Sequence, residues 1–262
     1  METKQHHHGH DVGERLYLHR HTFIHQLPPH VKILSGLTFI CVVIATPVTN
    51  VAAYLSYFAI IGLAITIARL PWKTVLKRSL IEIPFVLFAL LMPFFGTGAR
   101  VEFLGLSLYE EGLIAGAGII AKGTLGILTA ILLSSSTTAR EILRGLETLR
   151  LPALLIQIAT FMLRYMNVVN DEMERMRIAR AARGFDATGV KHWKVIANSA
   201  GALFIRSYER GERVHLAMIS RGYTGHMPRE ERIATSTRDL IQGFSLPALA
   251  CIALIFSLLV RR

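Results

Sequence analysis

Cysteine and acidic residues are scarce in this sequence. Of its 262 residues only two are cysteine, Cys41 and Cys251, and both lie in apolar stretches without CxxC spacing. We therefore expect both to be buried as small hydrophobic residues, with no disulfide or redox role. Asp and Glu number 18 against 29 Lys and Arg, which gives a formal net charge of +11. An excess of this sign favours anionic partners, such as lipid headgroups or nucleic acid.

Sequence motifs for catalysis are missing as well. The chain contains no GxxxxGK[ST] phosphate-binding loop, no HExxH zinc motif and no glycine pattern for binding a dinucleotide. It also lacks paired carboxylates beside a nucleophile. We therefore expect a protein that is not an enzyme and that hydrolyses no ATP itself.

Long apolar runs, by contrast, are abundant. Hydrophobic residues make up 52% of the chain and the mean hydropathy is +0.43, values that soluble domains of this length rarely show. A helix needs about 20 apolar residues to cross a bilayer. The sequence predicts an all-α polytopic membrane protein with about five transmembrane helices, the first two joined by a tight turn at 46–50. The spans are expected within 31–68, which holds two, and at about 80–95, 112–133 and 240–260.

Basic residues near the spans predict the orientation of the chain. The loop at 69–78 has four basic residues and no acid, whereas the loop at 96–111 has three glutamates and one arginine. Because Lys and Arg are retained on the cytoplasmic side, the first loop, the N-terminal tail and the polar block should lie inside. We divide the chain into a His-rich cytoplasmic tail at 1–30, four transmembrane helices at 31–133, cytoplasmic helices at 134–239 and a fifth transmembrane helix at 240–262.

Two ionisable residues fall inside predicted spans. Lys122 lies at the centre of the fourth span and Glu82 near the inner end of the third. Charged groups at such depths are costly and are candidates for a function. Because the two residues should lie at different depths, we expect Lys122 to face a partner helix or backbone carbonyl oxygens rather than Glu82. The alternative is that Lys122 snorkels toward an interface.

The polar block at 134–239 is predicted to be helical. Ser and Thr residues at 134–138 supply N-caps for a short helix at 139–149, which Pro152 interrupts. One long helix follows from Pro152, and a second from about His192 to Arg221. An apolar stripe persists along the first over about 30 residues and must pack on another surface. The stripe comprises Leu155, Met162, Val169 and Met176, with Ile158 and Tyr165 between them.

Both long helices end in the same pattern, Ala-x-x-x-Arg-Gly-aromatic. Gly after a helix favours positive φ, and an Arg in the last turn complements the negative end of the helix dipole. A single end of this kind is commonly only a helix stop, but a second matched copy favours a function. The copies are Ala179 with Arg183-Gly184-Phe185, and Ala217 with Arg221-Gly222-Tyr223.

At these residues the chain resembles the transmembrane T component of energy-coupling factor (ECF) transporters, a branch of the ABC superfamily. That family carries two Ala-Arg-Gly signatures at the ends of cytoplasmic coupling helices. Ala182-Arg183-Gly184 fits the first signature, and Ser220-Arg221-Gly222 fits the second with Ser in place of Ala. The segment from Phe23 to Lys32 resembles the start of cobalt-type members, the CbiQ group. The resemblance also implies supporting roles in the coupling domain for Arg164, Asp186, Ala179 and Ala217.

The resemblance implies a complex. Each signature would insert into a groove on one of two ATPase subunits, and a small S component would capture the solute. ATP and Mg²⁺ would be bound by the ATPases, and this chain would hold no cofactor. Cobalt would be the substrate, with nickel or a vitamin as open alternatives. The location would be the cell membrane of a bacterium or archaeon.

The His-rich tail and the net charge leave two further hypotheses open. Neutral imidazole is a good ligand for Co, Ni, Cu or Zn, so one hypothesis is that the tail scavenges or senses the transported metal. The alternative is a His tract with no role in transport. In a different class of function, the block at 134–239 would bind anionic lipid or nucleic acid. Its interspersed acids and its lack of interleaved aromatic residues argue against nucleic acid. The candidate metal ligands are His6, His7, His8 and His10.

Overall fold

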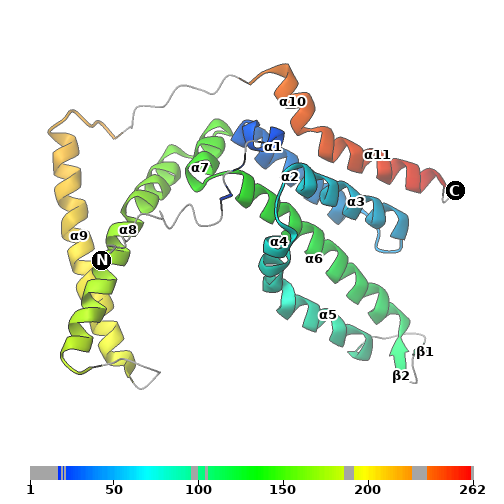
Figure 1. Ribbon diagram of the computed structural model, residues 1–262, viewed down its shortest axis with the longest axis horizontal. Helices are drawn as coiled ribbons and strands as arrows, with labels where there is room; N and C mark the ends of the chain where they lie inside the picture. Colours follow the sequence, from blue (N-terminus) through cyan, green and yellow to red (C-terminus); the bar gives the residue numbers. More distant parts are fainter. Residues whose placement is uncertain are drawn as a thin grey trace, which may run out of the picture. The chain divides into compact units, whose positions relative to one another are not determined.

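The computed structural model describes residues 17–18, 20, 22–95, 100–103, 106–185, 192–225 and 235–260. These residues are almost entirely helical (Figure 1), which confirms the predicted all-α fold class. They fall into two compact units. One unit is made of residues 17–149 with 235–260, and the other of residues 150–225.

The larger unit contains the predicted spans. Helices α2 and α3 occupy the region expected to hold the first two, and α5, α6 and α11 occupy the next three. The helices of this unit are α1 (Phe23–Gln26), α2 (Pro29–Ala45), α3 (Val51–Ile67), α4 (Trp72–Ser79), η2 (Leu80–Glu82), α5 (Ile83–Phe95), α6 (Glu110–Ser136), α7 (Ala139–Thr148), α10 (Thr237–Gly243) and α11 (Ser245–Val260).

Fewer than five of the described helices are long and apolar enough to be counted as membrane spans. Within the described ranges, α6 and α8 (Ala153–Ala182) are each long and apolar enough to cross a membrane, and α10 with α11 forms a third candidate that is bent by 44°. Helices α2 and α3 are apolar but shorter. The number of five spans therefore stays a prediction. Helix α8, which we placed in the cytoplasm, is nevertheless as apolar as a span over part of its length.

Polar side chains tie the first two apolar helices to the last one. Asn50 caps α3 by accepting a hydrogen bond of 3.4 Å from the Ala53 amide, and its Nδ2 donates to Ser257 Oγ of α11 at 2.7 Å. The predicted turn also places Thr46 Oγ1 2.9 Å from the hydroxyl of the buried Tyr57. Polar groups inside an apolar bundle need such partners. These bonds therefore fix the positions of α2, α3 and α11 relative to one another.

Glycine allows α5 to approach α6 closely. A Cβ atom at Gly112 would lie 2.5 Å from the carbonyl oxygen of Met92, and one at Gly116 would lie 2.5 Å from that of Ala89. The two glycines are four residues apart and so share one face of α6. Larger residues at these positions would push the two helices apart.

The loop at 96–111 contains a short hairpin that we did not predict. Strand β1 (Arg100–Phe103) pairs antiparallel with β2 (Leu106–Tyr109), and Arg100 lies opposite Tyr109. Tyr109 is followed directly by α6, so the hairpin leads into that helix. Two strands of four residues each leave the fold class unchanged.

Helix α7 belongs to the larger unit. Thr138 and Glu141 form a capping box, with bonds of 2.8 Å and 3.3 Å between each backbone amide and the other side chain. A Cβ atom at Gly145 would lie 3.0 Å from the backbone nitrogen of His30. Because Gly145 has no side chain, α7 packs directly on the first turn of α2. The polar block predicted at 134–239 is thus divided between the two units.

The smaller unit is an antiparallel helical hairpin of α8 and α9 (Trp193–Ile219), two helices with nearly the bounds that we predicted. Arg180, near the end of α8, donates a hydrogen bond to the hydroxyl of Ser199, near the start of α9. At the other end of the hairpin, the Tyr223 hydroxyl donates to Gln157 Oε1 at 3.2 Å. The last turn of each helix therefore lies beside the first turns of the other.

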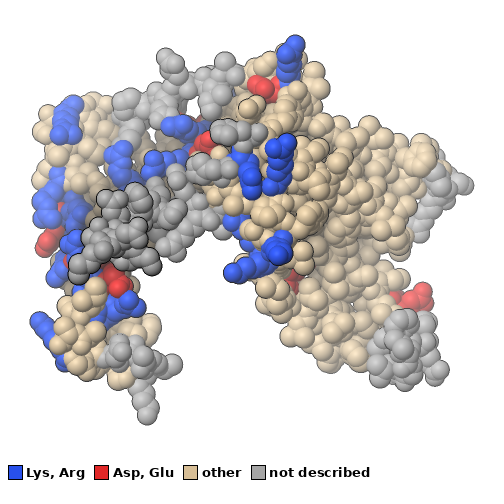
Figure 2. Space-filling model, in the orientation of Figure 1, with Lys and Arg blue, Asp and Glu red and all other residues tan. Residues whose placement is uncertain are grey.

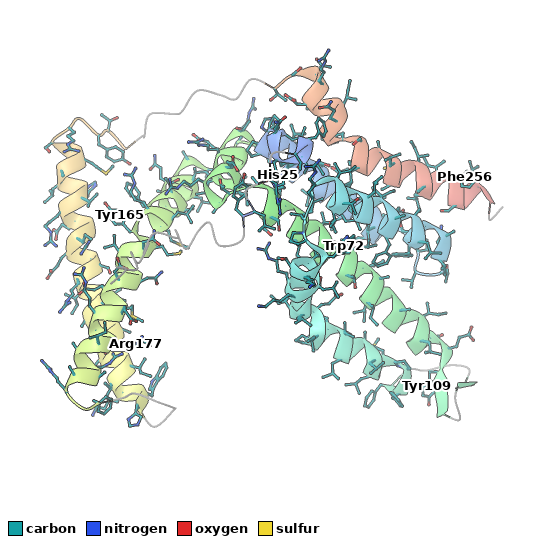
Figure 3. All side chains as sticks on the ribbon, viewed as in Figure 1. His25, Trp72, Tyr109, Tyr165, Arg177 and Phe256 are labelled. Atoms are coloured by element: carbon teal, nitrogen blue, oxygen red, sulfur yellow. The ribbon has the colours of Figure 1, made fainter. Side chains whose placement is uncertain are left out.

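Large apolar side chains lie on the outside of the larger unit. Trp72 of α4 and Phe256 of α11 are 48% and 67% exposed (Figure 3). On the face in Figure 2, Lys and Arg gather over α8 and α9 and at one end of the larger unit, and most of the remaining surface is uncharged. Cys41 is exposed and Cys251 partly buried, both as free thiols. The expectation that both are buried is wrong for Cys41, because α2 is apolar on its outer face too.

Candidate functional site

The first Arg-Gly-aromatic segment closes α8 with a Schellman motif. Gly184 has a φ of +73°, and its amide donates to the carbonyl of Ala181 at 2.9 Å. The Phe185 amide donates to the carbonyl of Arg180 at 3.1 Å. These two bonds are the 5→2 and 6→1 pair that defines the motif. Arg183 is left as the last residue before the reversal of the chain.

The second segment closes α9 in the same way. Gly222 has a φ of +84°, its amide donates to the carbonyl of Ile219 at 2.9 Å, and the Tyr223 amide donates to that of Met218 at 3.0 Å. A Cβ atom at Gly184 or Gly222 would meet no atom within 4 Å. The backbone angle, not crowding, is therefore what favours glycine at both positions. The predicted helix ends with positive φ are confirmed.

Both arginines of the two ends are available to a partner. Arg183 and Arg221 are exposed, and neither side chain has a hydrogen bond or ion pair with any residue that the structure describes. Each guanidinium group carries five N–H donors in a planar fork, which bonds carboxylate or backbone oxygens and stacks on aromatic rings. The two arginine side chains can therefore bind an acidic or carbonyl-lined groove without breaking an existing contact.

The two ends lie far apart because the helices are antiparallel. Helix α9 has 27 residues, which corresponds to about 40 Å at 1.5 Å per residue. Arg183 is at one end of the hairpin and Arg221 is at the other. The two ends cannot serve one compact ligand, but they can hold two separate partner surfaces.

The other residues predicted for the coupling domain and the tail lie at different places in the chain. Ser220 Oγ donates to the carbonyl of Ala217 at 3.0 Å, so the hydroxyl that departs from the Ala-Arg-Gly signature is bonded within its own helix. Ala179 and Ala182 are exposed in the last turn of α8. Arg164 is also exposed but lies about five turns before the end of that helix. Asp186, His6, His7, His8 and His10 lie outside the described residues.

The two ionisable residues that fall inside predicted spans have separate partners. Lys122 Nζ donates to the carbonyl oxygen of Ile44, at the end of α2, at 3.0 Å. Glu82 is buried and accepts a hydrogen bond of 2.9 Å from Thr124 Oγ1. The prediction that Lys122 faces a backbone carbonyl is confirmed. In the ranges that the structure describes, no group of three or more His, Cys, Asp or Glu residues could hold a metal ion.

Comparison with known proteins decides the family. Residues 20–232 match the family described as cobalt transport protein, CbiQ. The chain belongs to the CbiQ family. The energy-coupling factor transporter transmembrane protein EcfT of Bacillus subtilis (strain 168) is 30% identical, with 90% of this chain and 94% of the relative covered. The EcfT protein of Clostridium kluyveri is 26% identical over 94% and 96%, and the cobalt transport protein CbiQ of Rhodobacter capsulatus is 27% identical over 75% and 78%.

This CbiQ-family protein is therefore a membrane-embedded T component of the energy-coupling factor type. One junction between its helices was not predicted from the sequence. Lys32 is buried, and its ammonium group donates bonds of 2.9 Å to the carbonyl oxygens of His25 and Ser136. The sequence does contain a signal for this contact, because Lys32 is the only charged residue between 31 and 68.

The environment of His25 follows from this junction. Burial, together with the nearby charge of Lys32, lowers the pKa of His25 below its usual value. Its Nε2 lies 3.2 Å from the carbonyl oxygen of Leu18, and its Nδ1 lies 2.6 Å from Thr22 Oγ1. The neutral ring therefore holds the segment before α1 against the bundle.

Proposed function

We propose that this protein couples two ATPase subunits to a substrate-binding S component in an ECF-type importer. The observation that carries the proposal is the pair of exposed arginines, Arg183 and Arg221, each presented on an identically capped helix end with no intramolecular partner among the described residues. Each arginine would enter a groove on one ATPase. ATP and Mg²⁺ would stay on the ATPases, and this chain would bind no cofactor.

The hairpin suits the transmission of motion. Glu172 of α8 pairs with Arg206 of α9, and Gln157 bonds Tyr223, so the two helices are linked at several levels. A displacement of one capped end would therefore be passed to the other helix rather than absorbed by bending. Coupling requires contacts that differ between two states. Closure of the ATPases would supply that difference at the two arginine ends.

We further propose that the transported ion is Co²⁺. The description of the matching family and the name of the Rhodobacter capsulatus relative support cobalt. Relatives named EcfT carry no ion in their names, and nickel or a vitamin are the competing substrates. We also propose that the protein crosses the cell membrane several times and that its N-terminus and the α8–α9 hairpin lie in the cytoplasm.

Charge reversal at the two ends tests the proposal. We expect Arg183→Glu and Arg221→Glu each to weaken binding of the ATPase at that helix end by about thirtyfold or more, because lost charge-assisted contacts cost about 2 kcal/mol or more. The double variant should abolish ATP-dependent Co²⁺ uptake while still inserting in the membrane. Arg213→Glu, at an exposed position of α9 about two turns before Arg221, is the matched control. Full ATPase retention and normal uptake by the double variant would contradict the proposal.

A further inference from the structure

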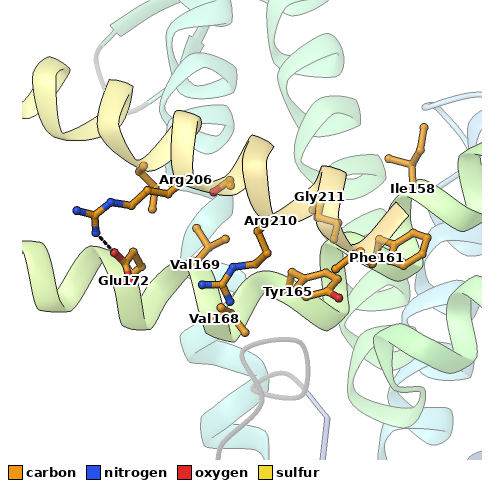
Figure 4. Close-up of a pocket in the computed structure, with 13 residues that line it drawn as sticks. Ile158, Phe161, Tyr165, Val168, Val169, Glu172, Arg206, Arg210 and Gly211 are labelled. Atoms are coloured by element: carbon orange, nitrogen blue, oxygen red, sulfur yellow. Dashed lines mark hydrogen bonds and ion pairs between the residues drawn. The ribbon is translucent and has the colours of Figure 1, made fainter. Parts of the chain in front are cut away.

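A cavity of about 370 Å³ separates the two helices of the hairpin near its middle (Figure 4). Its walls are mostly apolar and include Phe161, Tyr165 and Val169 of α8. The rings of Phe161 and Tyr165 are stacked, with their centroids 6.3 Å apart. The predicted apolar stripe of α8 thus faces this space, and α9 fills it only in part.

The charges at the cavity do not balance. Arg206 and Arg210 of α9 and Glu172 of α8 line it. Arg206 pairs with Glu172, whereas Arg210 has neither an ion pair nor a hydrogen bond to any described residue. In Figure 4 the Arg210 side chain reaches from α9 toward α8, near Tyr165 and Val168. One uncompensated cation at the rim of an apolar space favours a ligand with an anionic head and an apolar tail.

Among the residues that the structure describes, little covers the apolar part of α8. Its most hydrophobic window of 18 residues is apolar enough for a membrane, yet only 6% of that window is buried. Met162, which lines the cavity, is 61% exposed. Exposing such an apolar surface to water is unfavourable. Acyl chains satisfy this surface, and a helix with one apolar face can lie on the cytoplasmic surface of the membrane, where phospholipid is present.

We propose that the cavity binds one acyl chain of an anionic phospholipid, whose phosphate group is held by Arg210. Gly211 also lines the cavity, and a Cβ atom there would meet nothing within 4 Å, so the space beside Arg210 is open. The lipid tail lies against Phe161 and Tyr165 and fills the space between the helices. This site is independent of the contacts that Arg183 and Arg221 make at the ends of the hairpin.

Native mass spectrometry of the full-length protein with its co-purifying subunits tests the site. After reconstitution with equal phosphatidylglycerol and phosphatidylcholine and then mild delipidation, we expect the wild type to retain one phosphatidylglycerol. Arg210→Gln should lower that retention about tenfold. Arg213→Gln removes the same charge from α9 outside the cavity and should retain the lipid. Gly211→Leu keeps both arginines, fills the cavity and should also lose it.

Three results would overturn the site. One is equal retention of phosphatidylcholine and phosphatidylglycerol by the wild type, which would show no recognition of the anionic head. Another is unchanged phosphatidylglycerol retention in both Arg210→Gln and Gly211→Leu. The third is loss of a co-purifying membrane subunit from these variants with lipid retention unchanged, which would make the cavity a contact for protein. Because ATPase retention is read from the same spectra, failure of the lipid site is distinguishable from failure of the coupling function.

Discussion

The ammonium group of Lys32 donates a hydrogen bond of 2.9 Å to the carbonyl oxygen of Ser136, 104 residues along the chain. Ser136 is the last residue of α6, where the carbonyl groups have no partner in the helix and the dipole is negative. The same ammonium group bonds the carbonyl of His25 at the end of α1. One buried cation thus stabilises two helix ends, directly before the chain turns into α7.

We expect Lys32→Met to destabilise the protein by about 1–3 kcal/mol, because two buried carbonyl groups lose their donor while the apolar stem is preserved. The measurement is thermal unfolding of the purified protein in detergent. Lys73→Met removes an exposed lysine of α4 and should leave the transition within about 0.5 kcal/mol of the wild type. Equal behaviour of the two variants would mean that the Lys32 bonds contribute nothing to stability.

A second prediction concerns the glycines that cap the two helix ends. Gly184→Ala and Gly222→Ala should each destabilise the end of their helix by about 1 kcal/mol, because alanine is disfavoured at positive φ. The readout is hydrogen exchange at the amides of the last helical turn together with retention of the ATPases. Gly201→Ala, inside α9 and with open space around it, should instead stabilise by about 1 kcal/mol. A stabilising effect at Gly184 or Gly222 would contradict the cap.

A third prediction concerns the close packing of α5 on α6. A valine at Gly116 would place its Cβ atom 2.5 Å from the Ala89 carbonyl oxygen, so Gly116→Val should destabilise the protein by about 1–3 kcal/mol. Gly126 lies on the same helix with nothing within 4 Å of its would-be Cβ. The thermal transition of Gly126→Val should therefore change little, and comparable losses in both variants would contradict the close contact as the cause.

The pH dependence of stability follows from His25. Since burial and the charge of Lys32 lower the pKa of His25 in the folded protein, the unfolded chain binds the proton more tightly. The neutral ring therefore stabilises the fold at higher pH, and this contribution is lost as pH falls below about 6.5, the usual histidine value. We expect His25→Gln to flatten the decline in unfolding temperature between about pH 7 and 5. His215→Gln, which changes an exposed histidine of α9, should leave the decline as it is.

Much of this architecture could be predicted from the sequence because its signals are local. The turn at 46–50, the bounds of α8 and α9 and the positive φ of Gly184 and Gly222 follow from apolar runs and glycine chemistry. The attachment of α7 to α2 could not be predicted, because it depends on the fit of Gly145 against the backbone of His30. The sequence also could not predict that Arg210 lacks an ion pair among the described residues. Glu172 pairs with Arg206 instead, and this choice depends on how α8 packs against α9.

The antiparallel arrangement of α8 and α9 has a consequence for the partners. Two antiparallel helices that end in the same Arg-Gly-aromatic cap are related by an approximate twofold rotation about an axis between them. A dimer whose axis coincides with this one would offer the same groove to each end. A single polypeptide carrying an internal pseudosymmetry can thereby match a symmetric or nearly symmetric pair of subunits, without a separate recognition surface for each.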